Sequence, residues 1–147
     1  MEYRIDVDIE APPEVVWRVI RDGERWHEWT ESVTSVRLLD RRPLRVGSRA
    51  LIRQPRFPPA VWKVTALEPG HSFTWRSGMP LMWVYGHHSV ERHAKGTRAT
   101  LRLTYEGLLA RIMGRMTRGI TLRYLNMEAS GLKRRSEENA RAVLSAS

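Results

Sequence analysis

A few polar side chains interrupt segments that otherwise alternate between apolar and polar residues. The candidates for general acid–base chemistry are His88, Glu91, Tyr105, Tyr124 and Arg53. Histidine exchanges a proton near neutral pH, and a tyrosine hydroxyl can donate a hydrogen bond to a carbonyl oxygen. Each of these residues also has a structural interpretation, because strand histidines and tyrosine rings often belong to a core and arginines are usually solvated. Both interpretations remain open at this point.

Metal and cofactor chemistry is not favoured by the sequence. The histidines are His27, His71, His87, His88 and His93, and cysteine is absent. Neighbouring residues of a strand point to opposite faces, so His87 and His88 cannot both bind one ion without a bulge. No His-Glu-x-x-His spacing, glycine-rich phosphate loop or dinucleotide fingerprint occurs. We therefore expect no metal and no cofactor.

The C-terminal part of the chain carries apolar residues at the period of an α-helix, which predicts one long helix over about 108–144. The apolar face holds Leu109, Ile112, Met113, Met116, Ile120, Tyr124 and Met127. Methionine is flexible and polarizable, so this face either fills a core or roofs a ligand cavity. The remaining faces carry many arginines together with Glu128, Glu137 and Glu138, and we expect them to be solvated.

Two further features of this helix bear on its packing. Gly114 and Gly119 weaken a helix and favour a kink between them. A second apolar stripe lies on the side opposite the methionines and comprises Leu122, Leu125, Leu132 and Val143. This stripe needs a partner surface, and a homodimer is one hypothesis.

The remainder of the chain predicts a sheet. Tyr3, Ile5, Val7 and Ile9 alternate with charged residues as in a half-buried strand, and two short helices follow, one after Pro12-Pro13 and one over Glu24 to Trp29. Six further strands are expected over 33–39, 48–54, 60–67, 72–76, 82–93 and 98–106. Their short connections favour an antiparallel meander. The prediction is one α+β domain over residues 1–147, with two short helices between the first two strands.

Composition limits the function classes. The 147 residues carry a net charge of +9, but arginines occur in every segment and no nucleic-acid-binding signature accompanies them. Specific nucleic-acid binding is therefore disfavoured, whereas an acidic partner or an anionic ligand suits the charge. The chain has no apolar run long enough for membrane insertion and no signal-peptide pattern at its start, so a soluble, cytoplasmic protein is expected.

Several phrases, in this order and spacing, carry a resemblance over nearly the whole chain. They are Val7-Asp8-Ile9-Glu10-Ala11-Pro12-Pro13-Glu14-Val15-Val16-Trp17, Trp26-His27-Glu28-Trp29, Trp62-Lys63-Val64-Thr65, Gly96-Thr97-Arg98, Tyr105-Glu106-Gly107-Leu108-Leu109 and Gly131-Leu132-Lys133-Arg134-Arg135. The sequence resembles the START-like, helix-grip (SRPBCC) superfamily, in particular its branch of polyketide cyclase/dehydrase and lipid-transport proteins. The phrases are specific for a fold and say little about chemistry.

The resemblance implies a strongly curved, seven-stranded antiparallel sheet wrapped around the long C-terminal helix, with an apolar cavity between them. Such a cavity receives a lipid, sterol, polyketide or similar molecule. From the alternation of the strands and the helical stripe, we expect the cavity to be lined by Ile52, Gln54, Trp62, Val64, Phe73, Trp75, Trp83, His88, Leu101, Leu103, Tyr105, Met113, Met116, Ile120, Tyr124 and Met127. Which face of the 82–93 strand points inward stays open, because both faces carry apolar residues.

Three functions follow as hypotheses. The first is binding of a small hydrophobic ligand, lipid-like, aromatic or polyketide-like. The second is a cofactor-independent polyketide cyclase, aromatase or dehydratase in the same cavity, with His88 as base, Tyr105 as donor, and Gln54 or Arg53 fixing a carbonyl. The third is a basic interaction module for a partner protein or nucleic acid.

Overall fold

The computed structural model describes residues 1–40 and 43–146. The elements along the chain are β1 (Glu2–Ile9), α1 (Pro13–Arg21), the 3-10 helix η1 (Gly23–Glu28), β2 (Ser35–Leu38), β3 (Arg49–Gln54), β4 (Phe57–Glu68), β5 (Ser72–Met79), β6 (Met82–His93), β7 (Gly96–Glu106), α2 (Ala110–Met116) and α3 (Arg118–Ala146). Proline at the start of α1 suits the first helical turn, where a backbone N–H has no partner inside the helix.

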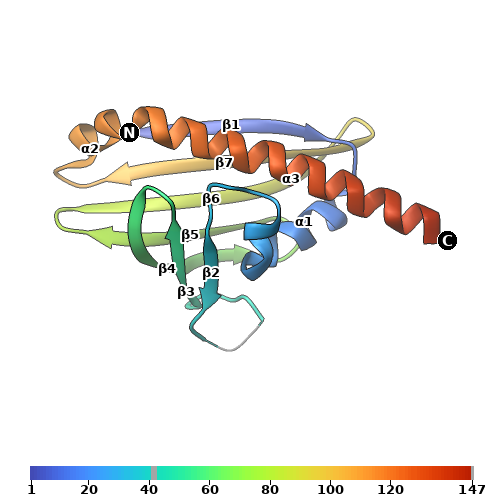
Figure 1. The fold of residues 1–147 in the computed structure, drawn as a ribbon, viewed down its shortest axis with the longest axis horizontal. Helices are drawn as coiled ribbons and strands as arrows, with labels where there is room; N and C mark the ends of the chain where they lie inside the picture. Colours follow the sequence, from blue (N-terminus) through green and yellow to red (C-terminus); the bar gives the residue numbers. More distant parts are fainter. Residues whose placement is uncertain (41–42, 147) are drawn as a thin grey trace.

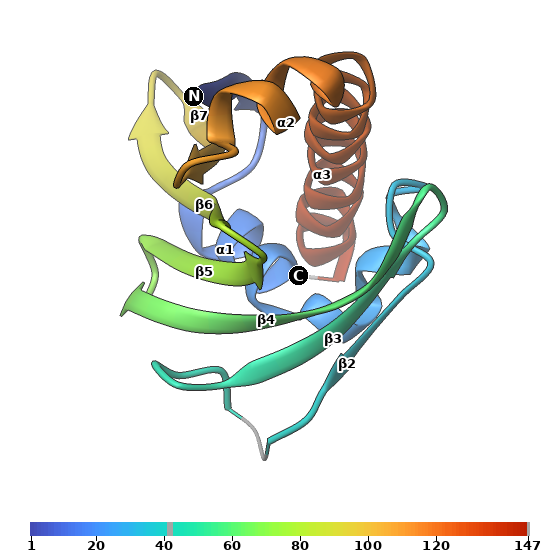
Figure 2. The same ribbon diagram turned by 90° about the vertical axis from the view of Figure 1, so that its left-hand side faces the viewer.

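The strands form one antiparallel sheet in the order β1-β7-β6-β5-β4-β3-β2. The sheet curls around α3, which runs along its concave side (Figures 1 and 2). Register irregularities between Ile52 and Gln54 in β3, and between Val64 and Ala66 in β4, lie where the sheet turns toward β2. Bulges of this kind bend strands. The predicted α+β helix-grip architecture, with two short helices between the first two strands, is confirmed.

The main core lies between α1, η1 and the middle strands. Trp17, Trp26, Phe73 and Trp75 are buried there and pack ring against ring. Inward positions alternate along each strand, as the burial of Phe73, Trp75 and Ser77 in β5 shows. Aromatic rings therefore fill this half of the concave face.

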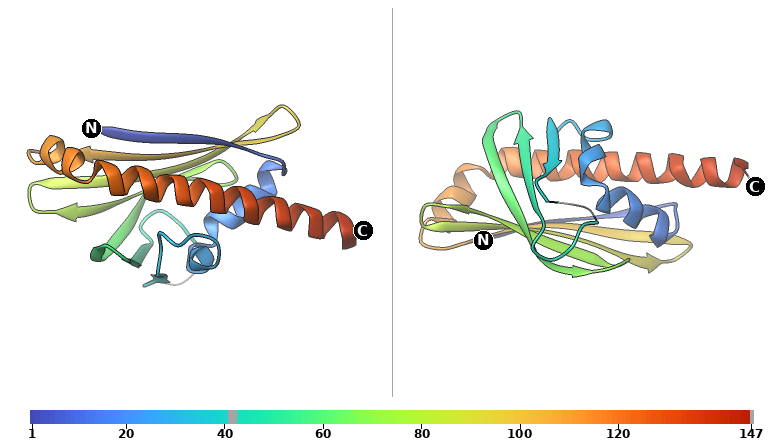
Figure 3. Two further views of the ribbon diagram at one scale, coloured as in Figure 1. Left: turned by 45° about the horizontal axis from the view of Figure 1, so that its top comes forward. Right: turned by 90° about the horizontal axis from the view of Figure 1, so that it is seen from below.

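The predicted single C-terminal helix is two helices in the structure. The break is at Thr117, whose hydroxyl donates a hydrogen bond to the Met113 carbonyl at 2.7 Å and contacts the Tyr105 hydroxyl at 3.2 Å. Because of the break, the buried side changes, and α2 buries Ala110 and Gly114. Figure 3 shows α3 continuing from this point along the length of the sheet.

The assignment of the two apolar stripes to faces was partly wrong. Leu125 and Leu132, assigned to an outward stripe, are buried in α3 against β1, β7 and the main core. Met116, assigned to the inner face, is exposed. The homodimer hypothesis rested on an exposed second stripe, and the burial of its two central leucines removes that basis.

Helix α3 approaches the end of η1 so closely that it allows no side chain at Gly131. A Cβ built there would overlap the carbonyl oxygen of Trp29. The same carbonyl accepts a hydrogen bond from Arg134 at 3.1 Å, and Arg135 pairs with Glu28 at 3.0 Å. These contacts fix α3 against η1. Among the residues described, no helix is long and apolar enough to cross a membrane.

Candidate functional site

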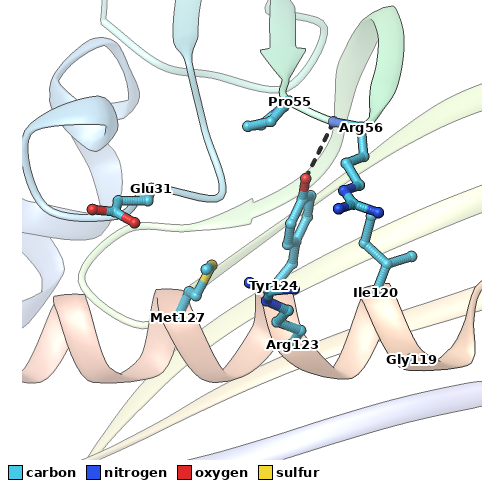
Figure 4. Close-up of a pocket in the computed structure, with 8 residues that line it drawn as sticks. All are labelled: Glu31, Pro55, Arg56, Gly119, Ile120, Arg123, Tyr124 and Met127. Carbon is cyan, nitrogen blue, oxygen red and sulfur yellow. Dashed lines mark hydrogen bonds between the residues drawn. The ribbon is translucent and has the colours of Figure 1, made fainter.

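A cavity of about 370 Å³ opens between the first turns of α3 and the turn that joins β3 to β4 (Figure 4). Its lining residues are Glu31, Pro55, Arg56, Gly119, Ile120, Arg123, Tyr124 and Met127. Ile120, Tyr124 and Met127 recur on one side of α3 because residues four and three apart lie on the same helix face. These three were expected to line a cavity, and the structure brings them together.

Tyr124 links the two walls of this cavity. Its hydroxyl oxygen accepts a hydrogen bond from the backbone N–H of Arg56 at 3.3 Å, drawn as the dashed line in Figure 4. Its ring also meets Phe57 edge to face, with centroids 5.8 Å apart. The phenol therefore holds the β3–β4 turn over the helix while its ring forms part of the apolar wall.

Charged groups gather at the edge of the cavity. Arg56 comes from the turn, Arg123 from α3 and Glu31 from the loop after η1. Neither guanidinium forms an ion pair with another residue of the described chain. Sequence reasoning missed all three residues, together with Pro55 and Gly119. Only Arg123 had a usable signal, since it precedes Tyr124 on the predicted helix.

A polar cluster includes residues that neighbour the cavity lining in sequence. Ser32 donates a hydrogen bond from its hydroxyl to the Glu128 carboxylate at 3.5 Å and shares a 2.7 Å hydrogen bond with Thr30. Gln54 donates from its side-chain amide to the Ser32 carbonyl at 3.2 Å. Glu128 directly follows Met127 and Ser32 directly follows Glu31, and both Met127 and Glu31 line the cavity. Glu128 was expected on a solvated face, but it points inward from α3.

The surroundings of Glu128 change its proton affinity. Burial raises the pKa of its carboxyl group from 4.5 to about 7, although the hydrogen bond from Ser32 favours the ionised form. A carboxyl group with such a pKa is divided between its two protonation states at neutral pH. It can therefore act as a proton donor or acceptor there.

His88 is on the inward face of β6, with Met82, Val84 and Val90, whereas Trp83, Tyr85 and His87 point outward. Its imidazole stacks on Phe73 with centroids 4.5 Å apart and contacts Trp26 and Trp75. Nδ1 is buried and has no hydrogen-bond partner among the described residues. Burial lowers the pKa of His88 to about 3, and nearby His87 adds to the effect. The ring lies in the aromatic core and does not line the cavity beside Tyr124.

Tyr105 is buried at the junction of α2 and α3. Its hydroxyl lies 2.9 Å from the Thr121 hydroxyl and 3.2 Å from that of Thr117. Its ring meets Tyr3 edge to face. The hydroxyl is thus engaged with two helical threonines, and this arrangement fixes the helix junction to β7.

Gln54, also expected to line the cavity, bonds to Ser32 in the polar cluster, and the other expected residues fall into three groups. Ile52, Val64, Phe73, Trp75 and Leu101 are buried in the core, and Trp62, Leu103 and Met113 pack partly buried against it. Trp83 and Met116 are exposed, so their assignment was wrong. Trp83 lies on the outer face of the sheet because strand alternation places it opposite Met82 and Val84, and the Arg76 guanidinium covers its ring at 4.2 Å.

A second hollow, of about 390 Å³, lies on the outer face of the sheet. His71, Thr74, His87 and Arg102 contribute to its polar lining. The His87 ring shares a 2.8 Å hydrogen bond with Thr74. Within residues 1–40 and 43–146, no group of three or more His, Asp or Glu side chains is placed to hold a metal ion.

The same fold occurs in solved structures. The Zhui aromatase/cyclase from Streptomyces sp. R1128 superposes with a TM-score of 0.78 at 15% identity, over 97% of both chains. The di-domain ARO/CYC StfQ from the steffimycin biosynthetic pathway gives 0.76 at 13% identity over 95% of this chain, which spans 51% of StfQ. The protein TTHA0849 from Thermus thermophilus gives 0.67 at 22% identity, over 97% of this chain and 99% of that one.

These similarities define a helix-grip protein, and at such identities they establish the fold alone. A search of curated proteins found no match. The family model for polyketide cyclase / dehydrase and lipid transport matches residues 2–137, and the chain belongs to that family.

Proposed function

We propose that the protein binds a small, largely apolar molecule with an anionic or oxygen-rich end in the cavity between α3 and the β3–β4 turn. The observation that carries this proposal is the joint lining by an apolar helix face and two unpaired arginines. The volume of about 370 Å³ falls in the range of small-molecule sites. Apolar contacts with Ile120, Tyr124 and Met127 would supply most of the affinity.

The arginines support the choice of ligand class. Guanidinium groups donate paired hydrogen bonds to carboxylates and other planar oxygen groups, and such charge-assisted bonds are stronger than neutral ones. Arg56 and Arg123 enter the cavity from opposite walls, so together they can orient one end of a ligand. Glu31 supplies the single negative charge among the lining residues and disfavours a second anionic group near it.

Dye binding tests this proposal. The anionic apolar dye 8-anilinonaphthalene-1-sulfonate should bind wild type, and Gly119→Phe should abolish binding by filling the cavity, because Gly119 lines the cavity and a Cβ atom there meets no atom within 4 Å. Arg56→Gln with Arg123→Gln should weaken the anionic dye about tenfold and leave uncharged N-phenyl-1-naphthylamine almost unchanged. The control is Arg37→Gln, an exposed position on β2. Equal dye binding by wild type and Gly119→Phe would refute the site.

Glu128 favours a second candidate function, ring closure of a polyketone by aldol condensation with loss of water. One group must remove a proton from carbon and return a proton to the departing hydroxyl. Glu128 is better suited to this than His88, because its pKa is about 7 and it directly follows the cavity-lining Met127 in the chain. Structural neighbours named as aromatase/cyclases support the same candidate.

The two candidates differ in what happens to the bound molecule. A carrier returns a poly-β-ketone unchanged, whereas a cyclase converts it to a product lighter by one water, which mass spectrometry detects. If the protein is a cyclase, Glu128→Gln should remove turnover and retain dye binding. Turnover that Glu128→Gln leaves intact would exclude this role for Glu128.

A further inference from the structure

The outer side of α2 presents apolar residues to solvent at regular spacing. Ile112 and Met116 of α2 are 58% and 75% exposed, and their interval of four residues places them on one side of the helix. Leu108, which is 83% exposed in the turn just before α2, adds a third apolar side chain, and we call these three residues the apolar ridge. The opposite side of α2 already packs inward through Ala110 and Gly114. The ridge is therefore not part of the core.

The turn between β5 and β6 extends this apolar surface. Met79 and Leu81 are exposed there, and the Leu81 carbonyl accepts a hydrogen bond from the Leu109 N–H at 3.4 Å, which ties the turn to the start of α2. Figure 1 shows the β5–β6 turn and α2 at the same end of the molecule. Leu81 has a φ of 63°, a conformation that glycine adopts without strain. An exposed leucine is thus held at the tip at a steric cost.

A row of positive charge flanks the ridge. Arg111, Arg115 and Arg118 are exposed, and each of the first two directly precedes a ridge residue in the chain. No ion pair joins any of the three to another described residue. Helix α2 itself contains no acidic residue. An apolar ridge beside unpaired arginines is the arrangement of a helix that lies in the interface of an anionic membrane.

We propose that the apolar ridge of Leu108, Ile112 and Met116, together with Leu81, docks on an anionic lipid surface through the flanking arginines. Charge complementarity selects this occupant, because anionic lipid headgroups pair with the arginines while the acyl region takes up the ridge. The docked end adjoins the cavity, whose lining on α3 begins at Gly119. Docking does not depend on the proposed ligand, and the two are tested separately.

Vesicle flotation tests the docking. Wild type should float with phosphatidylcholine vesicles containing about 30 mol% phosphatidylglycerol and remain largely unbound to pure phosphatidylcholine. Arg111→Gln with Arg115→Gln should weaken partitioning about 25-fold, since each arginine contributes about fivefold near an anionic surface. The triple variant Leu108→Ser, Ile112→Ser and Met116→Ser should abolish binding. These side chains are exposed, so both variants should remain folded by circular dichroism.

Two control variants separate this surface from general charge and general hydrophobicity. Arg18→Gln with Arg21→Gln removes the same charge from the exposed side of α1 and should leave partitioning unchanged. Val46→Ser removes an exposed apolar side chain from the loop before β3 and should also leave it unchanged. All variants should bind the anionic dye as wild type does, which keeps this test distinct from that of the cavity.

Three results would overturn the proposal. The first is no flotation of wild type with anionic vesicles, and the second is equal loss of binding in the α1 control. The third is a dimer of wild type that the ridge substitutions convert to a monomer in light scattering, because the ridge would then contact a second copy of the chain.

Discussion

His88 is a titratable residue enclosed by aromatic rings, and this environment determines its charge. Stacking on Phe73 and contact with Trp26 exclude water from the imidazole. A charged imidazolium would lose its hydration there without gaining a carboxylate partner. The folded protein therefore keeps His88 neutral, whereas the unfolded chain can protonate it.

Acid should destabilise the fold through His88. Its pKa is about 3 in the folded state against a usual 6.5, so the unfolded state binds more protons as the pH falls below 6.5. Stability should drop by about 1.4 kcal/mol per pH unit from this source. His88→Phe should remove that slope in urea unfolding between pH 6.5 and 4. Exposed His27→Gln is the control, and a slope unchanged in His88→Phe would contradict the assignment.

The titration of Glu128 should change the stability of the fold in the opposite direction, with a loss as the pH rises. Its folded pKa of about 7 exceeds the ordinary 4.5, so the native state holds the extra proton between these values and stability falls as the pH rises through them. Glu128→Gln should therefore stabilise the protein above pH 7, by up to about 3 kcal/mol. At pH 4 it should change stability little. Equal effects at pH 4 and pH 8 would show that the carboxyl group is not perturbed.

The sequence alone could not assign two of these side chains. Both faces of the 82–93 strand carry apolar residues, so alternation left His88 and Trp83 interchangeable until the register with β5 and β7 was known. Glu128 looked like a surface charge because its partner Ser32 is 96 positions away. Side-chain environment at such sites depends on long-range packing that local periodicity does not report.

At the scale of elements, local patterns predicted most of the strands and the short helices. The break between α2 and α3 was anticipated only as a kink near Gly114 and Gly119. Its position follows from Thr117, which bonds to the Met113 carbonyl and to Tyr105 on β7. A contact between a helix and a strand therefore sets the boundary between α2 and α3. Because the helix breaks there, Met116 lies on the exposed side of α2.

Two glycines of α3 should respond differently to substitution by alanine, because only one of them packs closely on η1. Gly131→Ala should destabilise the protein by about 3 kcal/mol, because the methyl group would overlap the Trp29 carbonyl. Gly119→Ala should stabilise it by up to about 1 kcal/mol, since the new methyl group meets no atom within 4 Å and alanine favours helix. Thermal unfolding of both variants measures the difference. A Gly131→Ala variant as stable as Gly119→Ala would mean that α3 is not so close to η1.

The whole molecule divides its concave face into a filled part and an open part. Trp26, Phe73, Trp75 and His88 occupy the side near α1 and η1, while the cavity lies near the β3–β4 turn. The order of strands and helices was predictable because each has its own periodicity. The location of the open space was not, since it depends on how far the aromatic core extends beneath α3.

The link between Tyr124 and the β3–β4 turn sets a time scale. A ligand in the cavity would lie under a turn tied to α3 by one hydrogen bond and one ring contact. Turns held so lightly open in nanoseconds to microseconds, whereas whole domains unfold over far longer times. Residence of the bound molecule would then depend on the movement of one hairpin, and exchange would proceed while the rest of the fold stays intact.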